Sequence, residues 1–416
     1  SFQIHAQKLF HKSLIGDNTN GFCIADANPD GGYTIAGRMT HSGIAVVSFD
    51  ACDNVKWTKN IDAHNGTIDL KRMAVTSSGE ILLAGDYSNL HKDFFVIKLS
   101  DQGDLLFFKR YGLELTEELF SFGTLHGEGF FISGASIQNG ASVPIVVVLD
   151  VNGDVKWSKS FADFGSGLKA EATKDGGMLL LLKNIIKIDA HGNVEWVKSY
   201  EFNSGNDYHG FMNPVEVDDG YIFTYYYSAN QASSRSGSFK LDLNGEPVWI
   251  GEKFVGGTLA DVLLQDNGNL MLLSMRYGNP DNQPIYLIEL DDTGNVLRVI
   301  NKKIPRENYQ GYAFSLKKLF GGDIILTGYE KELLDIPTVR QFYVTRTNYD
   351  FDLDACGEEM AFTRAAKDTI EFTDDLIDDK SKQMNEEDVT PVYGTYAFTE
   401  DYVCEQEITL NLDIGN

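Results

Sequence analysis

The residue types that most often perform catalysis are few in this chain, and they fall in no familiar catalytic spacing. Its eight histidines include no H-E-x-x-H pair, the arrangement that places two zinc ligands and a base on one helix. Neither a G-x-S-x-G nucleophile elbow nor a phosphate-binding P-loop occurs. The sequence therefore predicts no catalytic residue and no cofactor, and it favours a protein that is not an enzyme.

The densest carboxylate cluster is the segment DFDLDACGEE, residues 350–359. Asp350, Asp352 and Asp354 alternate along it and are weak candidates for holding a cation, because hard cations prefer oxygen ligands. Turns such as DVNGD and DDTGN resemble calcium loops only in part, since they lack the twelve-residue register that ends in a glutamate. A turn role is the simpler interpretation of those repeated segments.

Four cysteines are present, Cys23, Cys52, Cys356 and Cys404, and none lies in a C-x-x-C or C-x-x-H spacing. A zinc site is therefore not predicted. An even, low count fits two disulfides in an exported protein or four free thiols in a cytosolic one. For an exported protein we expect one bridge between Cys23 and Cys52 and a second between Cys356 and Cys404.

Composition excludes several classes of function. The chain has 416 residues and a net charge of −26, which argues against binding a nucleic-acid backbone. No apolar run reaches the ~18 residues of a membrane-spanning helix. Residues 1–6, SFQIHA, end in alanine before glutamine, as a signal-peptidase site does. They are interpreted as a secretory-signal remnant, with an ordinary N-terminal strand as the alternative.

One sequence motif recurs along the chain and indicates the strands that must position the residues discussed above. It reads FDACDNVKWTKNI at 49–61, LDVNGDVKWSKSF at 149–161 and IDAHGNVEWVKSY at 188–200. A second marker, a glycine followed by an apolar run such as GGYTIAG, precedes it in each unit. Both markers occur seven times. The position after the turn is occupied by Phe10, Trp57, Phe107, Trp157, Trp196, Trp249 and Arg298.

Each unit carries four strand signals separated by turns whose Gly or Asn accepts a positive φ. Seven such units predict an all-β protein, a seven-bladed β-propeller. The aromatic after the turn is predicted to pack between neighbouring blades, burying about 150–250 Å². The lysine two positions later, as in Lys109 and Lys198, is expected to face solvent.

The two ends of the chain predict how the ring closes. The N-terminal phrase KLFHKSL matches a fourth strand, yet no first three strands precede it. The last unit, near residues 312–348, supplies three strands and lacks a fourth. We therefore expect the N-terminal strand to complete the seventh blade and hide its edge. The expected propeller spans residues 7–350.

Residues 351–416 are expected to form a small acidic C-terminal β extension. Residues 350–416 hold 19 Asp and Glu against 4 Lys and Arg, a net charge of −15. Residues 373–391 are predicted to be a solvated linker or mobile loop. The segments VYGTYAF and EQEITLNLDI after it are predicted to be strands, stapled by Cys356 and Cys404 into one appended element.

The third-to-fourth-strand phrase, as in VVVLDVNGDVKWSKSF, resembles the repeat of exported β-propeller proteins of Bacteroidota that are associated with type IX secretion and gliding motility. The resemblance spans about residues 8–348. It implies export to the cell surface or, alternatively, the periplasm, and a role in binding, adhesion or assembly. The chain departs from that group in having no recognisable C-terminal type IX sorting domain.

The expected function is that of a non-enzymatic scaffolding or binding module at the outer membrane or cell surface. Its expected partner is a protein or a glycan, and the sequence does not distinguish the two. The alternative is a glycan-active lyase or hydrolase that uses the central channel. Carboxylates, histidines or arginines converging in a deep pocket would favour the enzyme. A plugged channel and a broad exposed apolar patch would favour the binding module.

Overall fold

A computed structural model describes most of the chain, and every structural statement below concerns the residues it describes. These are 8–15, 19–39, 43–63, 65–113, 115–125, 129–138, 140–161, 168–182, 184–202, 208–228, 235–252, 254–255, 258–275, 285–302, 309–332, 340–348, 357–359, 370–374, 379–381, 385–388, 391–394 and 399–407.

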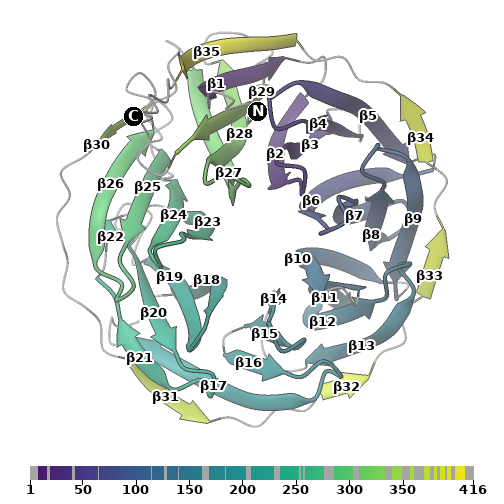
Figure 1. Ribbon diagram of the computed structural model, residues 1–416. Helices are drawn as coiled ribbons and strands as arrows, with labels where there is room; N and C mark the ends of the chain where they lie inside the picture. The colour runs from purple at the N-terminus through teal and green to yellow at the C-terminus, as the bar shows by residue number, and fades with distance from the viewer. Residues whose placement is uncertain are drawn as a thin grey trace, which may run out of the picture.

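The described strands form seven antiparallel sheets around a central axis, the seven-bladed β-propeller predicted from the repeat (Figure 1). We number the blades 1 to 7 along the chain. In blades 1 to 6 the first strand lies nearest the axis and the following strands lie progressively farther out. No helix occurs in the described part of the chain.

The first six blades have the following strands. Blade 1 contains β2 (Thr19–Ala27), β3 (Tyr33–Met39), β4 (Ile44–Phe49) and β5 (Val55–Ala63). Blade 2 contains β6 (Thr67–Val75), β7 (Ile81–Ser88), β8 (Lys92–Leu99) and β9 (Leu105–Gly112). Blade 3 contains β10 (Thr116–Leu125), β11 (Gly129–Gln138), β12 (Ala141–Leu149) and β13 (Val155–Phe161). Blade 4 contains β14 (Lys169–Ala172), β15 (Met178–Leu181), β16 (Ile185–Ile188) and β17 (Val194–Phe202). Blade 5 contains β18 (Tyr208–Val217), β19 (Gly220–Ser228), β20 (Arg235–Leu241), β21 (Pro247–Ile250) and β22 (Phe254–Val255). Blade 6 contains β23 (Thr258–Leu264), β24 (Leu270–Met275), β25 (Ile285–Leu290) and β26 (Val296–Lys302).

Blade 7 joins the two ends of the propeller. It contains β27 (Tyr309–Lys318), β28 (Ile324–Glu332), β29 (Arg340–Thr347) and, as its fourth strand, β1 (Lys8–Ile15). In this pairing Phe10 lies opposite Arg346 and Leu14 lies opposite Phe342. The predicted closure by the N-terminal strand is therefore confirmed.

Burial explains why the strands stack radially. The second and third strands of a blade are largely buried on both faces; every residue of β4 (IAVVSF) is buried, for example. The buried apolar residues divide into seven clusters, and each cluster is shared by two neighbouring blades. The closing cluster contains Phe10 and Phe342 of blade 7 together with Tyr33 and Phe49 of blade 1. A single blade buries only part of this surface, so the ring must close for the core to form.

The aromatic after each turn reaches the third-to-fourth-strand turn of the next blade. Trp57 Nε1 donates a hydrogen bond to the Asp101 carbonyl oxygen at 2.9 Å, and Trp196 Nε1 donates to the Leu243 carbonyl oxygen at 3.1 Å. In each of these turns a glycine with positive φ lies against the ring. The glycine–aromatic pairs are Gly103 with Trp57, Gly153 with Phe107, Gly192 with Trp157, Gly245 with Trp196, and Gly294 with Trp249.

The expectation that the following lysine faces solvent is wrong. Lys109 Nζ lies 2.5 Å from Asp154 Oδ1, and Lys198 Nζ lies 2.7 Å from Glu246 Oε1 with its side chain only 6 % exposed. Both carboxylates belong to the turn of the next blade. The long lysine side chain spans the blade interface beside the aromatic, so both residues of the repeated phrase join one blade to the next.

The seventh position of the series is Arg298, and its contact differs. Its Nε donates to Glu289 Oε2 at 2.6 Å within blade 6. The next blade is blade 7, whose third and fourth strands come from opposite ends of the chain. No turn joins those two strands, so an aromatic at position 298 would have no turn glycine to contact.

These contacts predict the cost of filling a turn glycine. Gly103 has φ +80°, and a methyl group built on it would lie 2.9 Å from Trp57 Cδ2. Gly268 has φ +86° and nothing within 4 Å of the same position. Both alanine variants incur the left-handed strain of about 1–2 kcal/mol, and only Gly103→Ala also displaces the indole.

We therefore expect Gly103→Ala to lower the free energy of unfolding by about 1–3 kcal/mol more than Gly268→Ala does, as overpacked sites do. Urea denaturation of the two variants beside the parent protein measures the difference. Equal losses would show that the ring does not fill this contact.

The acidic C-terminal region is not one appended element. It supplies short strands to the outer edges of six different blades (Figure 1, outer arrows). They are β30 (Gly357–Glu359), β31 (Ile370–Asp374), β32 (Asp379–Ser381), β33 (Asn385–Asp388), β34 (Pro391–Gly394) and β35 (Thr399–Glu407). A solvated linker was predicted for residues 373–391, but this segment contains β32, β33 and the end of β31. The prediction relied on the acidic composition, whereas these strands pair through their backbones.

The predicted bridge between Cys23 and Cys52 is wrong, because both are free thiols. Cys23 is fully buried in β2, within the cluster that closes the ring. Cys52 is exposed in the turn between β4 and β5. The innermost strand and this turn are not adjacent in the blade. Cys356 and the side chain of Cys404 lie outside the described residues, so the second bridge stays a prediction.

Candidate functional site

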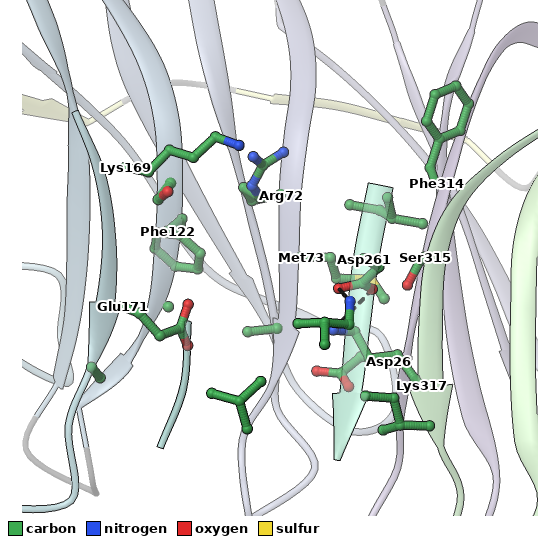
Figure 2. A pocket seen from close by; sticks show the side chains of 18 of the residues that line it. Asp26, Arg72, Met73, Phe122, Lys169, Glu171, Asp261, Phe314, Ser315 and Lys317 are labelled. Atoms are coloured by element: carbon green, nitrogen blue, oxygen red, sulfur yellow. Dashed lines mark hydrogen bonds and ion pairs between the residues drawn. The ribbon is translucent and has the colours of Figure 1, made fainter. Parts of the chain in front are cut away.

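The innermost strands of all seven blades line one cavity of about 520 Å³ on the propeller axis. Its wall carries both signs of charge (Figure 2). The labelled charged residues are Asp26, Arg72, Lys169, Glu171, Asp261 and Lys317. They come from β2, β6, β14, β23 and β27, so five blades contribute to one charged surface.

Two of the carboxylates act between neighbouring blades. Asp26 Oδ2 accepts a hydrogen bond from the Val75 backbone N–H of blade 2 at 2.8 Å. Asp261 Oδ2 accepts one from the Leu316 backbone N–H of blade 7 at 2.9 Å and lies 3.5 Å from Lys317 Nζ. Asp261 in particular raises the pKa of Lys317. These groups satisfy one another, so this side of the cavity is a structural ion cluster.

The cavity also brings two cations together, Arg72 and Lys169. Burial lowers the pKa of Arg72, and the carboxylates of Asp261 and Glu171 oppose that change. Figure 2 shows the Lys169 amine and the Arg72 guanidinium pointing toward one another. Arg72 Nη1 donates to the Lys71 carbonyl oxygen at 2.8 Å, which holds the guanidinium in place. Burial and, as the smaller cause, repulsion by Arg72 together lower the pKa of Lys169 to about 8. An anion placed between the two cations would relieve that repulsion.

Glu171 lies two residues after Lys169 on β14, so both side chains point to the same face of the strand. Its side chain is exposed to the cavity, with protein around it. Desolvation is the main cause of a Glu171 pKa raised to about 7, with Lys317 and Arg72 opposing the increase and Asp261 adding to it. Near neutral pH this carboxyl can therefore donate or accept a proton.

The cavity thus offers a cationic pair for an anionic group beside a carboxyl whose pKa is raised, chiefly by desolvation. No histidine is found among the described lining residues. The described residues contain no group of His, Cys, Asp and Glu arranged to hold a metal ion. They also include no helix long and apolar enough to cross a bilayer.

The residues singled out from the sequence lie elsewhere. The aromatics Phe10, Trp57, Phe107, Trp157, Trp196 and Trp249 belong to fourth strands, far out along each blade. Asp350, Asp352 and Asp354 lie outside the described residues, so a cation site there stays a prediction. Sequence reasoning missed Arg72, Lys169 and Glu171. A search of the first strand of each unit for charged residues at axis-facing positions would have found them.

Comparisons with known proteins place the chain in no family. No protein-family model matches it, and no curated protein is similar to it. A solved structure of a protein of unknown function from Bacteroides caccae is similar, with TM-score 0.42 and 15 % identity over 71 % of this chain and 94 % of that one. An ulvan lyase of family PL25 has TM-score 0.37 and 10 % identity over 80 % of this chain and 88 % of its own. A neuraminidase-like protein of subtype N10, from an influenza A strain of the little yellow-shouldered bat, has TM-score 0.35 and 9 % identity over 82 % and 98 %.

Proposed function

We propose that this protein is a binding module whose central cavity takes a saccharide carrying a carboxylate or sulfate group. The observation that carries the proposal is the convergence of Arg72 and Lys169 in the cavity. Guanidinium and ammonium groups are the side chains that best bind such oxyanions. Glu171 lies beside them, where it can hydrogen-bond sugar hydroxyls. The volume of about 520 Å³ is within the range of small-molecule sites.

The net charge of the protein is −26, so the cation pair of Arg72 and Lys169 is a distinctive place for an acidic ligand. The protein as a whole repels anions, and the cavity lining carries four acidic and four basic side chains. An acidic ligand would therefore be held by the local approach of Arg72 and Lys169, not by a net positive charge. We place the binding module in residues 7–350 and assign residues 351–416 an accessory role. Following the repeat resemblance, we propose that the protein is exported and acts at the cell surface, in contact with the outer membrane, with the periplasm as the alternative.

Calorimetric titration with a galacturonic acid trimer, beside a neutral galactose trimer, tests the proposal. We expect the acidic trimer to bind at least about tenfold more tightly, since charge-assisted hydrogen bonds are worth about 1.5–3 kcal/mol. Equal affinities for the two trimers, or no binding of either, would contradict the proposal. Displacement of the acidic trimer by inorganic sulfate would show that the shared oxyanion is recognised.

One observation favours an enzyme as the second candidate. Glu171, whose pKa is raised to about 7 by burial, has the acidity that a general acid requires at neutral pH. Incubation with an acidic polysaccharide, followed by assay of new reducing ends, tests this alternative. If the parent protein produces new reducing ends, and Glu171→Gln abolishes them while trimer binding persists, the protein is an enzyme. If no new reducing ends form, the protein is a binding module only.

A further inference from the structure

We propose that Asn65 is a site of spontaneous deamidation, at which the turn between β5 and β6 gains a negative charge and an isoaspartyl peptide bond. Asn65 is followed by Gly66, and both residues lie between the last strand of blade 1 and the first strand of blade 2. The change concerns the covalent structure of the chain, so the proposal is independent of the ligand proposed for the central cavity.

The reaction requires only the chain and water. The backbone nitrogen of Gly66 attacks the side-chain carbon Cγ of Asn65 and closes a five-membered succinimide ring. The side-chain amide leaves as ammonia, which takes up the proton that the Gly66 N–H loses. Water then hydrolyses one of the two carbonyl–nitrogen bonds of the ring. Cleavage at the backbone carbonyl leaves isoaspartate, and cleavage at the side-chain carbonyl leaves aspartate.

The Asn65–Gly66 turn leaves the attacking nitrogen accessible. Asn65 is exposed, and no described residue accepts a hydrogen bond from its side-chain amide or from the Gly66 N–H. Glycine has no Cβ, so no side chain of its own shields this nitrogen. The exposed Asn65 side chain can rotate to bring Cγ to it. The turn therefore meets both requirements of succinimide formation, an unshielded nitrogen and a side chain that is free to reach it.

Four other Asn–Gly pairs of the described chain are more constrained. Three lie in turns, at residues 152–153, 244–245 and 267–268, and one lies within β2, at residues 20–21. In each of the three turns the glycine N–H donates a hydrogen bond of 3.1 Å to the carbonyl oxygen three residues earlier. In β2 the glycine is buried. Attack by these nitrogens requires the turn or the strand to open first, and local opening costs free energy.

An isoaspartate adds one methylene group to the main chain where the backbone packs against a buried ring. A methyl group built on Gly66 would lie 2.6 Å from Tyr87 Cζ, so the glycine already contacts this ring closely. Tyr87 is buried and belongs to the apolar cluster shared by blades 1 and 2. The longer backbone must therefore displace either the turn or the start of β6, where Thr67 pairs with Ser88.

Peptide mapping of the full-length protein tests the proposal. After incubation at mildly alkaline pH, mass spectrometry follows the conversion of each asparagine to the corresponding acid. We expect Asn65 to react at least about tenfold faster than the three turn asparagines, the effect of about 1.4 kcal/mol of local opening. A methyltransferase specific for isoaspartate should label the Asn65 peptide. Equal rates at all four sites, or a product that contains aspartate alone, would overturn the proposal.

Two controls assign the result to the turn. In guanidinium, where the turns are unfolded, all four Asn–Gly pairs should react at similar rates; a preference for Asn65 that persists there would overturn the structural basis of the proposal. Freshly prepared Asn65→Asp supplies the charge without the extra methylene group. Hydrogen exchange at Thr67 and Ile68 should be severalfold faster in the isoaspartate form than in the parent protein and unchanged in Asn65→Asp. The same exchange rates in all three forms would overturn the inferred change of the backbone.

Discussion

Arg346→Met should lower the free energy of unfolding by about 3–5 kcal/mol, the usual cost of removing one partner from a buried ion pair. Arg346 is 7 % exposed and belongs to β29. Its Nη1 lies 2.8 Å from Asp53 Oδ2 of blade 1, and its Nε lies 2.8 Å from Asp323 Oδ2 of blade 7. The substitution leaves two buried carboxylates without their cation at the interface that closes the ring.

Asp53 is the one described non-glycine residue with positive φ, at 65°. Asp53 occupies the turn position at which the corresponding turns carry glycine. Its carboxylate binds Arg346, which ring closure brings next to blade 1. Lys174→Met is the matched control, since it removes an exposed pair with Asp218, and such pairs contribute about 0–1 kcal/mol. Guanidinium denaturation measures both variants. A loss below about 1 kcal/mol in Arg346→Met would mean that this contact does not hold the ring together.

Binding of an acidic saccharide should weaken as the pH rises from about 6 to 9. The pKa of Lys169 is lowered to about 8, chiefly by burial, so this cation is lost as the pH rises through 8. The pKa of Glu171 is raised to about 7, again chiefly by burial, so a repelling negative charge appears as the pH rises through 7. Both changes disfavour an anionic ligand. Each loss of 1.4 kcal/mol in binding free energy lowers the affinity about tenfold.

Three variants separate these contributions. Arg72→Met should reduce affinity by about 10- to 100-fold at every pH, the range of a lost charge-assisted hydrogen bond. Lys169→Met should reduce affinity at pH 6 and remove the dependence near pH 8, whereas Glu171→Gln should remove the dependence near pH 7. Lys174→Met, which removes a cation in an exposed pair with Asp218, should change neither. Calorimetry from pH 6 to 9 reads out each curve; a pH-independent affinity in the parent protein would contradict the assignment.

The propeller can be predicted from the sequence because the residues of the repeated motif make the contacts between neighbouring blades. Trp57 and Trp196 recur because each contacts the next blade's turn, and that contact is local and repeated. Arg298 breaks the series at the one place where the next turn is absent. The solvent-facing prediction for Lys109 and Lys198 was wrong because alternation along one strand says nothing of the neighbouring blade's turn.

The candidate site and the C-terminal edge strands β30 to β35 could not be predicted in the same way. Arg72 and Lys169 lie 97 positions apart on strands of different blades, and only ring closure brings them together. Both occupy the same position of the repeat, three residues before the end of the first strand, but that shared position does not show which charges face one another across the axis. Most of the C-terminal edge strands are short, and the region that contains them is acidic, so composition predicts solvation. These segments are strands because their backbones pair with the outer edges of the blades, and those edges exist only after the blades have formed.

The most direct test of the cavity as an oxyanion site is anomalous diffraction from crystals soaked in selenate, a dianion that selenium makes visible. We expect an anomalous peak in the cavity between Lys169 Nζ and the Arg72 guanidinium, and its loss in crystals of Arg72→Met. A cavity without a peak in the parent protein, or a peak that is unchanged in Arg72→Met, would contradict it.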